Sequence, residues 1–491
     1  ASLLPATALA DGTIFEVSTQ EALENVLARA QDGDTVRLVD DIAIDVTDTG
    51  TDTLVPMLYI NSDITLDLNK HELGYDQTNL DVSLVCTPCL ICVYGANVTI
   101  TGNGTIDAEA KNNNAYGINV VNNGSLSIEN GNFYGAITAI QVQSGRLNIY
   151  GGTYQFAETA ASSAPDSYKK YIINVIDSSY NTGSATVGIT GGTFVGFNPS
   201  ESPEGAGTSY VVGDCSVNEV TGKFVISAPT TQTDDHVAEV NGMYCTSLNN
   251  AIAAANRGAT VKLLKDFSED DVVVPKVSDI ILDLNGKTLN AGERLISQGN
   301  LTITDSTAAS EPVVSADYET VTYISGKIEV TKNVSATSGG TVTLKSGSII
   351  STYLGAYVQG DTTGATTIPS TFNIEGGYIE AQEFAATTQG KGATLNISGG
   401  TIYADGGVGV LARAGVANIT GGSIIATGNT SGQVGDSTII QNCYGIVYDE
   451  TSNYPGRTDS DLVTVSVSAA VTGHTGSKAV YLMQDETATA K

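Results

Sequence analysis

One short pattern recurs along this chain of 491 residues and restricts what it can fold into. It is an apolar–x–apolar triplet, a polar residue, a glycine pair or near equivalent, a small residue, and a β-branched or aromatic residue. The copies are LSIENGNFYG (126–135), LNIYGGTY (147–154), VGITGGTF (187–194), FNIEGGYI (372–379), LNISGGTI (395–402) and ANITGGSI (417–424). Consecutive copies are 21, 23 and 22 residues apart, measured from Gly131 to Gly152, Gly377 to Gly400 and Gly400 to Gly422.

This spacing predicts short strands joined by tight bends. Alternation with period two is typical of a strand, and the glycines indicate bends where the backbone takes a positive φ. Strands of this length cannot bury an apolar face alone, but stacked copies form a continuous core. We therefore expect an all-β fold, a parallel β-helix. A leucine-rich repeat has a similar period, but its L-x-x-L-x-L spacing and fixed turn asparagine are not found.

An asparagine often stands between the two apolar positions of the repeat. Examples are Asn148, Asn373, Asn396 and Asn418. Stacked strands would direct these side chains outward, where amides at strand spacing can hydrogen-bond along a ladder. We interpret these asparagines as structural.

A longer repeat divides the chain into two modules. QEALENVLARAQDGDTVRLV (20–39) matches TSLNNAIAAANRGATVKLL (246–264). In both, apolar residues at helical spacing are followed by a glycine, Gly33 or Gly258, which predicts a capping helix that stops there and then a strand. We expect an apolar arm or signal-peptide remnant over residues 1–13, a first module over 14–236 and a second over 237–491. Residues 187–229 would close the first module.

The charge balance excludes several classes of partner. There are 53 acidic and 22 basic residues, a formal net charge of −31. We find no basic patch, so neither nucleic acid nor an anionic membrane surface is expected to bind. No stretch reaches the roughly 18–20 apolar residues of a membrane span. Ala8-Leu9-Ala10 has the form of a signal-peptidase site, which suggests an exported protein.

Three closely spaced cysteines in VCTPCLICVYG (85–95) suggest a metal or redox centre at first. Cys86, Cys89 and Cys92 lack the fourth thiolate of an iron–sulfur site and the second ligand pair of a zinc site. On an extended chain Cys86 and Cys92 face one side and Cys89 the other, although Pro88 should bend the run.

In an exported protein, disulfide bonds are the default for six cysteines. We expect Cys215 and Cys245 to form one bridge. That leaves Cys443 to pair with one of the trio, within the chain or in a neighbouring subunit.

Acidic residues offer the remaining candidates for chemistry. Asp45, Asp48 and Asp52, and likewise Asp266, Glu269, Asp270 and Asp271, cluster near the starts of the modules. We interpret them as solvated loops, with a weak calcium site as the alternative and no other cofactor expected. A glycosidase would need two facing carboxylates. Glu375, Glu380 and Glu383 are candidates, but the sequence does not show that they converge.

The run VAEVNGMYCTSLNNAIAAANRGATVKLLKDF, the motif IILDLNGKTL and the LNISGGTI-type repeats resemble secreted bacterial surface repeat proteins. These have pectin-lyase-like, right-handed parallel β-helix modules. The resemblance implies a secreted or cell-surface location and non-catalytic structural or adhesive work, with a surface glycan or protein as partner. Polysaccharide lyases and glycoside hydrolases share this fold, so an enzyme of that kind is the alternative.

Self-assembly is a structural variant of the same hypothesis. The stretch ALADGTIFEV could add as a strand to an uncapped last rung of the next subunit, which would build a head-to-tail fibre. The residues of this assembly strand are Ala8, Leu9, Ala10, Ile14, Phe15 and Val17.

Overall fold

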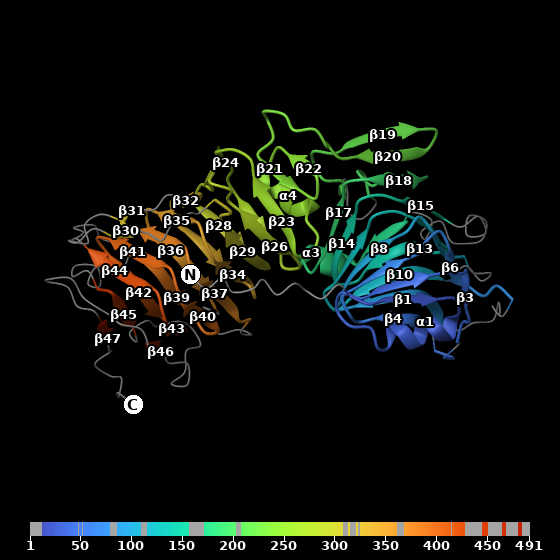
Figure 1. The fold of residues 1–491 in the computed structure, drawn as a ribbon, viewed down its shortest axis with the longest axis horizontal. Helices are drawn as coiled ribbons and strands as arrows, with labels where there is room; N and C mark the ends of the chain where they lie inside the picture. Colours follow the sequence, from blue (N-terminus) through green and yellow to red (C-terminus); the bar gives the residue numbers. More distant parts are fainter. Residues whose placement is uncertain are drawn as a thin grey trace. The chain divides into compact units, whose positions relative to one another are not determined.

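The structure is a computed structural model, and most of its described residues lie in parallel β-sheets (Figure 1). The described residues are 12–47, 49–51, 53–78, 86–109, 115–156, 171–202, 208–307, 313–314, 321–322, 325–360, 368–413, 415–427, 444–449, 464–467 and 480–483. Contacts divide the chain into two compact units. The first comprises residues 1–231 and 253–257, and the second residues 232–252 and 258–491.

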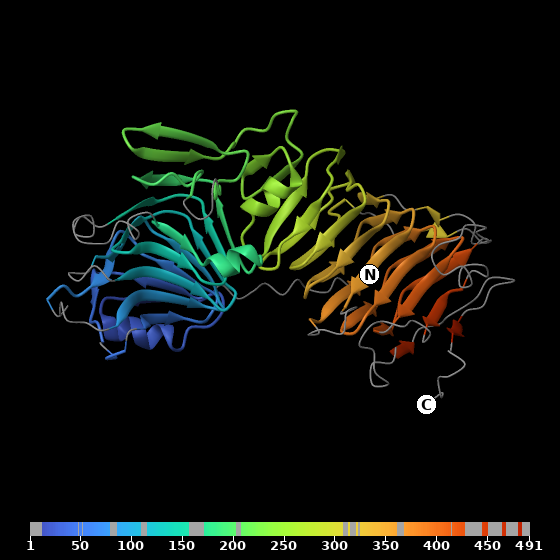
Figure 2. The same ribbon diagram turned by 180° about the vertical axis from the view of Figure 1, so that it is seen from behind.

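The first unit has three sheets, and the chain visits them in turn (Figure 2). From β2 onward, most strands pair in parallel with the strand three places further along the chain, an arrangement consistent with an all-β solenoid. The first sheet comprises β1 (Ile14–Val17), β2 (Thr35–Leu38), β5 (Ile64–Asp67), β8 (Asn97–Thr101), β11 (Gly124–Ile128), β14 (Gly145–Ile149) and β17 (Ala185–Ile189).

The second and third sheets complete the coil of the first unit. The second comprises β3 (Ile42–Ile44), β6 (Glu72–Tyr75), β9 (Thr105–Ala108), β12 (Asn132–Gly135), β15 (Thr153–Phe156) and β18 (Gly192–Val195). An antiparallel hairpin of β19 (Ser216–Val220) and β20 (Lys223–Ser227) extends it beyond β18. The third comprises β4 (Leu54–Ile60), β7 (Thr87–Tyr94), β10 (Tyr116–Val121), β13 (Thr138–Val142) and β16 (Ile173–Val175).

Two of the described helices belong to the first unit. Helix α1 (Gln20–Leu27) begins after Thr19, whose hydroxyl accepts a hydrogen bond from the Ala22 amide at 3.2 Å. It buries Leu23, Val26 and Leu27. The glycine stop predicted at Gly33 is wrong: the helix ends at Leu27, and Gly33 (φ 94°) turns the chain into β2. Helix α3 (Asp177–Asn181) follows β16.

The second unit repeats the three-sheet arrangement. Its first sheet comprises the antiparallel β22 (Met243–Cys245) and β21 (Ala238–Val240), then β23 (Ala259–Leu263), β26 (Asp279–Asp283), β29 (Asn300–Thr304), β34 (Thr341–Leu344), β37 (Ser370–Ile374), β40 (Ala393–Ile397), β43 (Val416–Ile419) and β46 (Thr464–Val467). Its second comprises β24 (Phe267–Ser268), β27 (Thr288–Asn290), β32 (Lys327–Val330), β35 (Ser348–Ser351), β38 (Tyr378–Ala381), β41 (Thr401–Asp405) and β44 (Ser423–Thr427).

The third sheet of the second unit comprises β25 (Val272–Val274), β28 (Arg294–Ser297), β33 (Asn333–Ala336), β36 (Leu354–Gln359), β39 (Phe384–Gln389), β42 (Val408–Arg413), β45 (Ile446–Asp449) and β47 (Val480–Met483). A two-stranded pair, β30 (Val313–Val314) with β31 (Val321–Thr322), lies outside these sheets. Helix α4 (Leu248–Ala254) precedes β23, and it too ends before the predicted glycine stop, Gly258.

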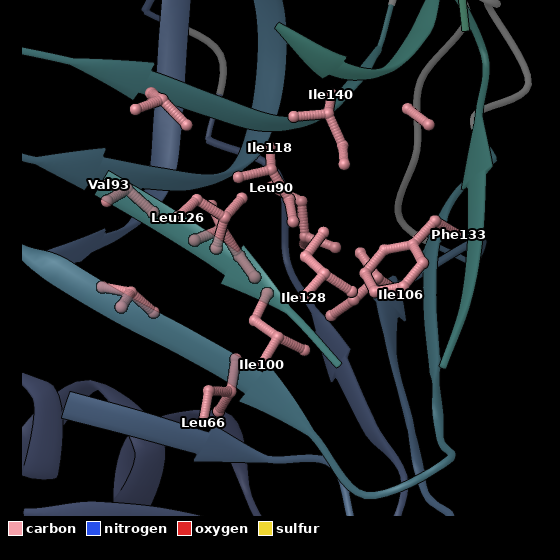
Figure 3. Packing of buried hydrophobic residues seen from close by; sticks show 14 of the residues in the cluster. Leu66, Leu90, Val93, Ile100, Ile106, Ile118, Leu126, Ile128, Phe133 and Ile140 are labelled. Atoms are coloured by element: carbon pink, nitrogen blue, oxygen red, sulfur yellow. The ribbon is translucent and has the colours of Figure 1, made fainter. Parts of the chain in front are cut away.

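The core of the first unit is built from ranks of identical or similar side chains on successive strands (Figure 3). Leu66, Ile100 and Ile128 are in register on the first sheet, and all three are buried. Aromatic rings stack in the same way on the second sheet: the Phe133 and Tyr154 centroids are 5.0 Å apart. Because every strand repeats the same inward positions, the core continues from coil to coil.

The asparagine ladder is confirmed for three of its four members. Asn418 Nδ2 donates to Asn396 Oδ1, and Asn396 Nδ2 donates to Asn373 Oδ1, each at 2.9 Å. Asn148 is different because its register neighbours are Ser127 and Gly188, which carry no amide. It accepts a hydrogen bond from Arg146 Nε instead.

Candidate functional site

The three clustered cysteines do not form a common centre. Cys89 and Cys92 both lie in β7, three residues apart, and Cys86 immediately precedes the strand. Pro88 lies within β7 and does not end the strand. Cys92 is in register with Tyr59 and Asn119, whereas Cys89 lies close to the carbonyl of Ile91, with Sγ at 3.2 Å.

Burial favours the protonated form of three of the described thiols, Cys89, Cys92 and Cys215. It raises the pKa of Cys89 far above the usual thiol range, and the neighbouring Cys92 adds to this effect. Burial also raises the pKa of Cys92 to about 11 and, together with the nearby Asp214, that of Cys215 to about 12. Because the thiolate is the nucleophile and metal ligand, these cysteines are poorly suited to either role.

No disulfide bond joins any two of the five cysteines that the structure describes. The expected bridge between Cys215 and Cys245 is therefore not formed here, and Cys215 Sγ lies 3.8 Å from the carbonyl of Thr190. Cys443 lies outside the described residues.

The predicted assembly strand is part of the chain's own first sheet. Ile14, Phe15 and Val17 lie in β1, which pairs in parallel with β2. Phe15 packs against the core and Val17 is buried, while the side chain of Ile14 is 53% exposed. Ala8, Leu9 and Ala10 lie outside the described residues.

Two of the clustered acids, Glu269 and Asp266, accept hydrogen bonds from backbone amides. The two carboxylate oxygens of Glu269 accept hydrogen bonds from the amides of Leu248 (2.5 Å) and Asn249 (2.9 Å), which open helix α4. Asp266 accepts from the Thr288 amide at 2.7 Å, and Asp45 donates its own amide to Gln20. Within the described parts of the chain, no group of three or more metal-ligating side chains converges. Asp48 and Asp52 are outside those parts.

The three carboxylates considered for glycoside hydrolysis differ in surroundings. Glu375 is exposed in the turn after β37. Glu380 accepts a hydrogen bond from Tyr378 Oη at 2.7 Å, and burial together with this bond raises the pKa of Tyr378. Burial raises the pKa of Glu383, whose Oε2 is buried without a hydrogen-bond partner. Glu380 and Glu383 do not interact with each other through any hydrogen bond described here.

The outer face of the third sheet in the first unit carries a hollow that the sequence reasoning missed. The hollow has a volume of about 420 Å³. Its lining comes from the starts of β4, β7 and β10 and from β13 and the residue after β16: Thr53, Leu54, Thr87, Tyr116, Gln141, Gln143 and Ile176. None of these side chains is charged, and most are polar.

Amides cross this face from strand to strand. Asn119, Gln141 and Asn174 are in register on β10, β13 and β16. Asn174 Nδ2 donates to Gln141 Oε1 at 2.9 Å, and Gln141 Nε2 donates to Asn119 Oδ1 at 3.3 Å. Asn119 Nδ2 reaches Gln143 Oε1 at 3.4 Å. Asn119 and Gln141 are buried, so these bonds fix the orientation of amides at the base of the face.

A second hollow, of about 500 Å³, opens at the start of the third sheet in the second unit. It differs in charge, because Asp270, Asp271, Glu293 and Arg294 all line it. Glu293 is paired with Lys332 at 2.6 Å, and this contact lowers the pKa of the Glu293 carboxyl.

Comparison with known proteins adds no relative: no protein-family model, curated protein or solved structure matches the chain. Among the described helices, none is both long and apolar enough to cross a membrane.

Proposed function

We propose that this protein is a non-catalytic extracellular or cell-surface structural and adhesion protein. Its fold would be a right-handed parallel β-helix in two related modules, each with an N-terminal capping helix, as in secreted bacterial surface repeat proteins of the pectin-lyase-like type. The observation that carries the proposal is that parts of the outward faces of two sheets are rows of uncharged amides hydrogen-bonded to one another. Such ranks form a rigid, repetitive surface suited to binding.

Equivalent hydrogen bonds near the starts of the two units support the two-module proposal. Gly33 donates to the carbonyl of Asp63, and Gly258 to that of Asp279, both at 2.7 Å. A second equivalence follows one turn later.

Asn69 Nδ2 donates to the carbonyl of Leu38, and Asn285 Nδ2 to that of Leu263, both at 2.9 Å. Both asparagines have a φ of 48°. Matching contacts at matching places are expected if one module arose as a copy of the other. The domain limits proposed are 1–13, 14–236 and 237–491.

Assembly into a head-to-tail fibre is part of the proposal, with a second copy of the chain as partner. Since β1 already pairs with β2, strand addition would use the other edge of β1. Deleting residues 1–17, which removes β1 together with Ala8–Ala10, should then abolish polymers seen by electron microscopy. Fibres that persist after the deletion would overturn the assembly proposal.

The alternative is a polysaccharide lyase or glycoside hydrolase, and one observation favours it. Glu383 combines a raised pKa with a buried, unpaired carboxylate oxygen, as a general acid can. A hydrolase needs a second carboxylate across a cleft, and Glu383 does not line either hollow. We therefore rank the non-catalytic role first.

Incubation with acidic and neutral polysaccharides, with and without calcium, separates the two functions. The non-catalytic role predicts neither new reducing ends nor unsaturated products. Products that disappear in a Glu383→Gln variant would overturn it in favour of the enzyme.

A further inference from the structure

The third sheet of the first unit is free of charge in a strongly acidic protein. Its strands, LVPMLYI, TPCLICVY, YGINVV, TAIQV and INV, contain no Asp, Glu, Lys, Arg or His, although the chain has 53 acidic residues. The described residues that line the hollow on its outer face are likewise uncharged. A charged ligand would find no counter-ion among these lining side chains, and the net charge of −31 would repel an anion.

One polar group at this hollow, the side-chain amide of Gln141, is held in place before any ligand arrives. Gln141 lines the hollow, is 6% exposed, and is held between Asn119 and Asn174. An amide carries two N–H donors and an oxygen with two lone pairs. Gln141 donates one N–H to Asn119 and accepts one from Asn174, which leaves one donor and one lone pair for a ligand. Gln143, also in the lining, is exposed. Groups that both donate and accept, held in place, suit ligand hydroxyls.

Exposed tyrosines extend the same face. Tyr94 is 48% exposed and in register with Val121. The pairing of Asn119 with Gln141 places Gln143 opposite Val121, so Tyr94 and Gln143 are two strands apart, about 10 Å. Tyr59, 52% exposed, stands in the neighbouring rank beside Cys92. Exposed aromatic rings offer flat apolar surfaces on which the C–H face of a sugar can pack.

We propose that this face is a binding site for a neutral glycan. Gln141 and Gln143 would bond to sugar hydroxyls in the hollow, and Tyr94 and Tyr59 would stack with residues further along the glycan. The hollow lies within the range of ordinary ligand sites, about 300–1,000 Å³. An extended peptide is a poorer match. It would bind by adding a strand to a sheet edge, whereas the hollow lies on the face of a sheet. The proposal rests on the non-catalytic role and names its ligand class.

Calorimetric titration of the full chain with cellohexaose, xylohexaose and mannohexaose, and with hexagalacturonic acid as the acidic comparator, tests the proposal. At least one neutral oligosaccharide should bind, and the acidic one should not. Gln143→Ala and Tyr94→Ala should each weaken binding about three- to tenfold, the range expected for one hydrogen bond or one aromatic contact. Gln143→Glu should not create binding of the acidic oligosaccharide.

Two variants control for general damage. Tyr94→Phe keeps the ring and should retain binding. Asn218→Ala removes an exposed amide on the β19 hairpin, away from the hollow, and should change nothing. Circular dichroism should show the same fold for all variants.

The failures are distinguishable. No binding of any neutral oligosaccharide, or binding that Gln143→Ala and Tyr94→Ala leave unchanged, overturns the glycan site. Binding of an extended peptide that Gln143→Ala weakens, in place of any sugar, overturns the ligand class. Release of reducing ends from a bound sugar overturns the non-catalytic function and leaves the site in place.

Discussion

The third sheets of the two units occupy the same place in their coils but carry different outer faces. In the first unit the outward rank runs Tyr59, Cys92, Asn119, Gln141 and Asn174, joined in part by amide hydrogen bonds. In the second unit an apolar cluster covers part of the corresponding face: Leu354, Phe384, Val408, Leu411, Tyr444 and Val447.

The inner faces, in contrast, are alike. Ile91, Ile118 and Ile140 are in register in the first unit, as Ala386, Val410 and Ile446 are in the second, and all are buried. The coil therefore constrains the inward ranks and leaves the outward ranks free to differ. Specific binding, where it exists, should be sought in those outward ranks.

The largest expected effect tests the contrast between inner and outer ranks within one strand. Ile118→Ala should lower the free energy of unfolding of the first unit by about 3 kcal/mol, because it leaves a cavity in a shared rank. Asn119→Ala, one residue later and outward, should cost about 1 kcal/mol. Urea unfolding followed by circular dichroism measures both. Equal losses would contradict the division of roles.

The next prediction concerns the reactivity of the Cys92 thiol in the outward row of the first unit. With the pKa raised to about 11, the thiolate fraction at pH 8 should be lower than in the unfolded chain by more than about a hundredfold. Iodoacetamide should label Cys92 in the native protein at a correspondingly lower rate, as read by mass spectrometry, with the protein in urea as reference. Rapid labelling of the native protein would show that the Cys92 thiol is accessible and reactive, against this prediction. A disulfide found under non-reducing conditions would restore the bridges expected from the sequence.

A smaller effect should separate the two outer faces. Leu411→Ala should cost about 2 kcal/mol, because Leu411 is 1% exposed within the apolar cluster of the second unit. The matched change in the first unit, Gln141→Ala, should cost about 1 kcal/mol. Hydrogen exchange measured unit by unit gives both values. If Gln141→Ala lowered the free energy of unfolding as much as Leu411→Ala does, the amide ladder would stabilise the first unit as much as the apolar cluster stabilises the second.

Acidification should change the stability contributions of particular carboxyls in the two units in opposite directions. Burial raises the pKa of Asp305, but hydrogen bonds from Gly326, Thr307 and Gly286 outweigh it, so the folded pKa is lowered. The stability from Asp305 is present above the unfolded pKa, about 3.9, and is lost as pH falls through the lower folded value. Asp305→Asn should cost about 1 kcal/mol at pH 7 and less at pH 2.

In the first unit the pKa values of Glu72 and Asp107 are raised, chiefly by burial. Their ionisation disfavours the fold, so the local contribution should improve as pH falls through the raised folded values towards the unfolded ones. Hydrogen exchange of β6 and β9 between pH 7 and pH 5 measures this. Loss of protection there over that range would contradict the sign.

Several local elements could be predicted because they depend on neighbours in sequence. The strand–turn–strand pattern around Gly131 and Gly152 follows from alternation and from positive φ values, which are 119° and 94°. The ladder of Asn373, Asn396 and Asn418 follows from a repeat of nearly constant length. The helix ends were misplaced because Gly33 and Gly258 serve the turn into the next strand, where each donates to a residue of the following coil.

The hollow on the first unit was not predicted, although a signal was present. The five stretches that form the third sheet are without charge, while acids are frequent in most of the chain. Recognising this requires knowing that 54–60, 87–94, 116–121, 138–142 and 173–175 lie side by side. The cysteine run suggested a metal centre or disulfide bonds for the same reason. Residue spacing alone cannot show that β7 lies between two other strands and that its thiols are buried.

The sequence by itself determined a chain of short strands, stacked in parallel, with glycine and asparagine at the bends. These features follow from period, alternation and local backbone preference. Only the tertiary structure decided which outward side chains become neighbours across coils, because residues such as Asn119, Gln141 and Asn174 are brought together by strand register. The charge, shape and hydrogen bonding of a surface therefore depend on strand register, and so does the proposed binding site.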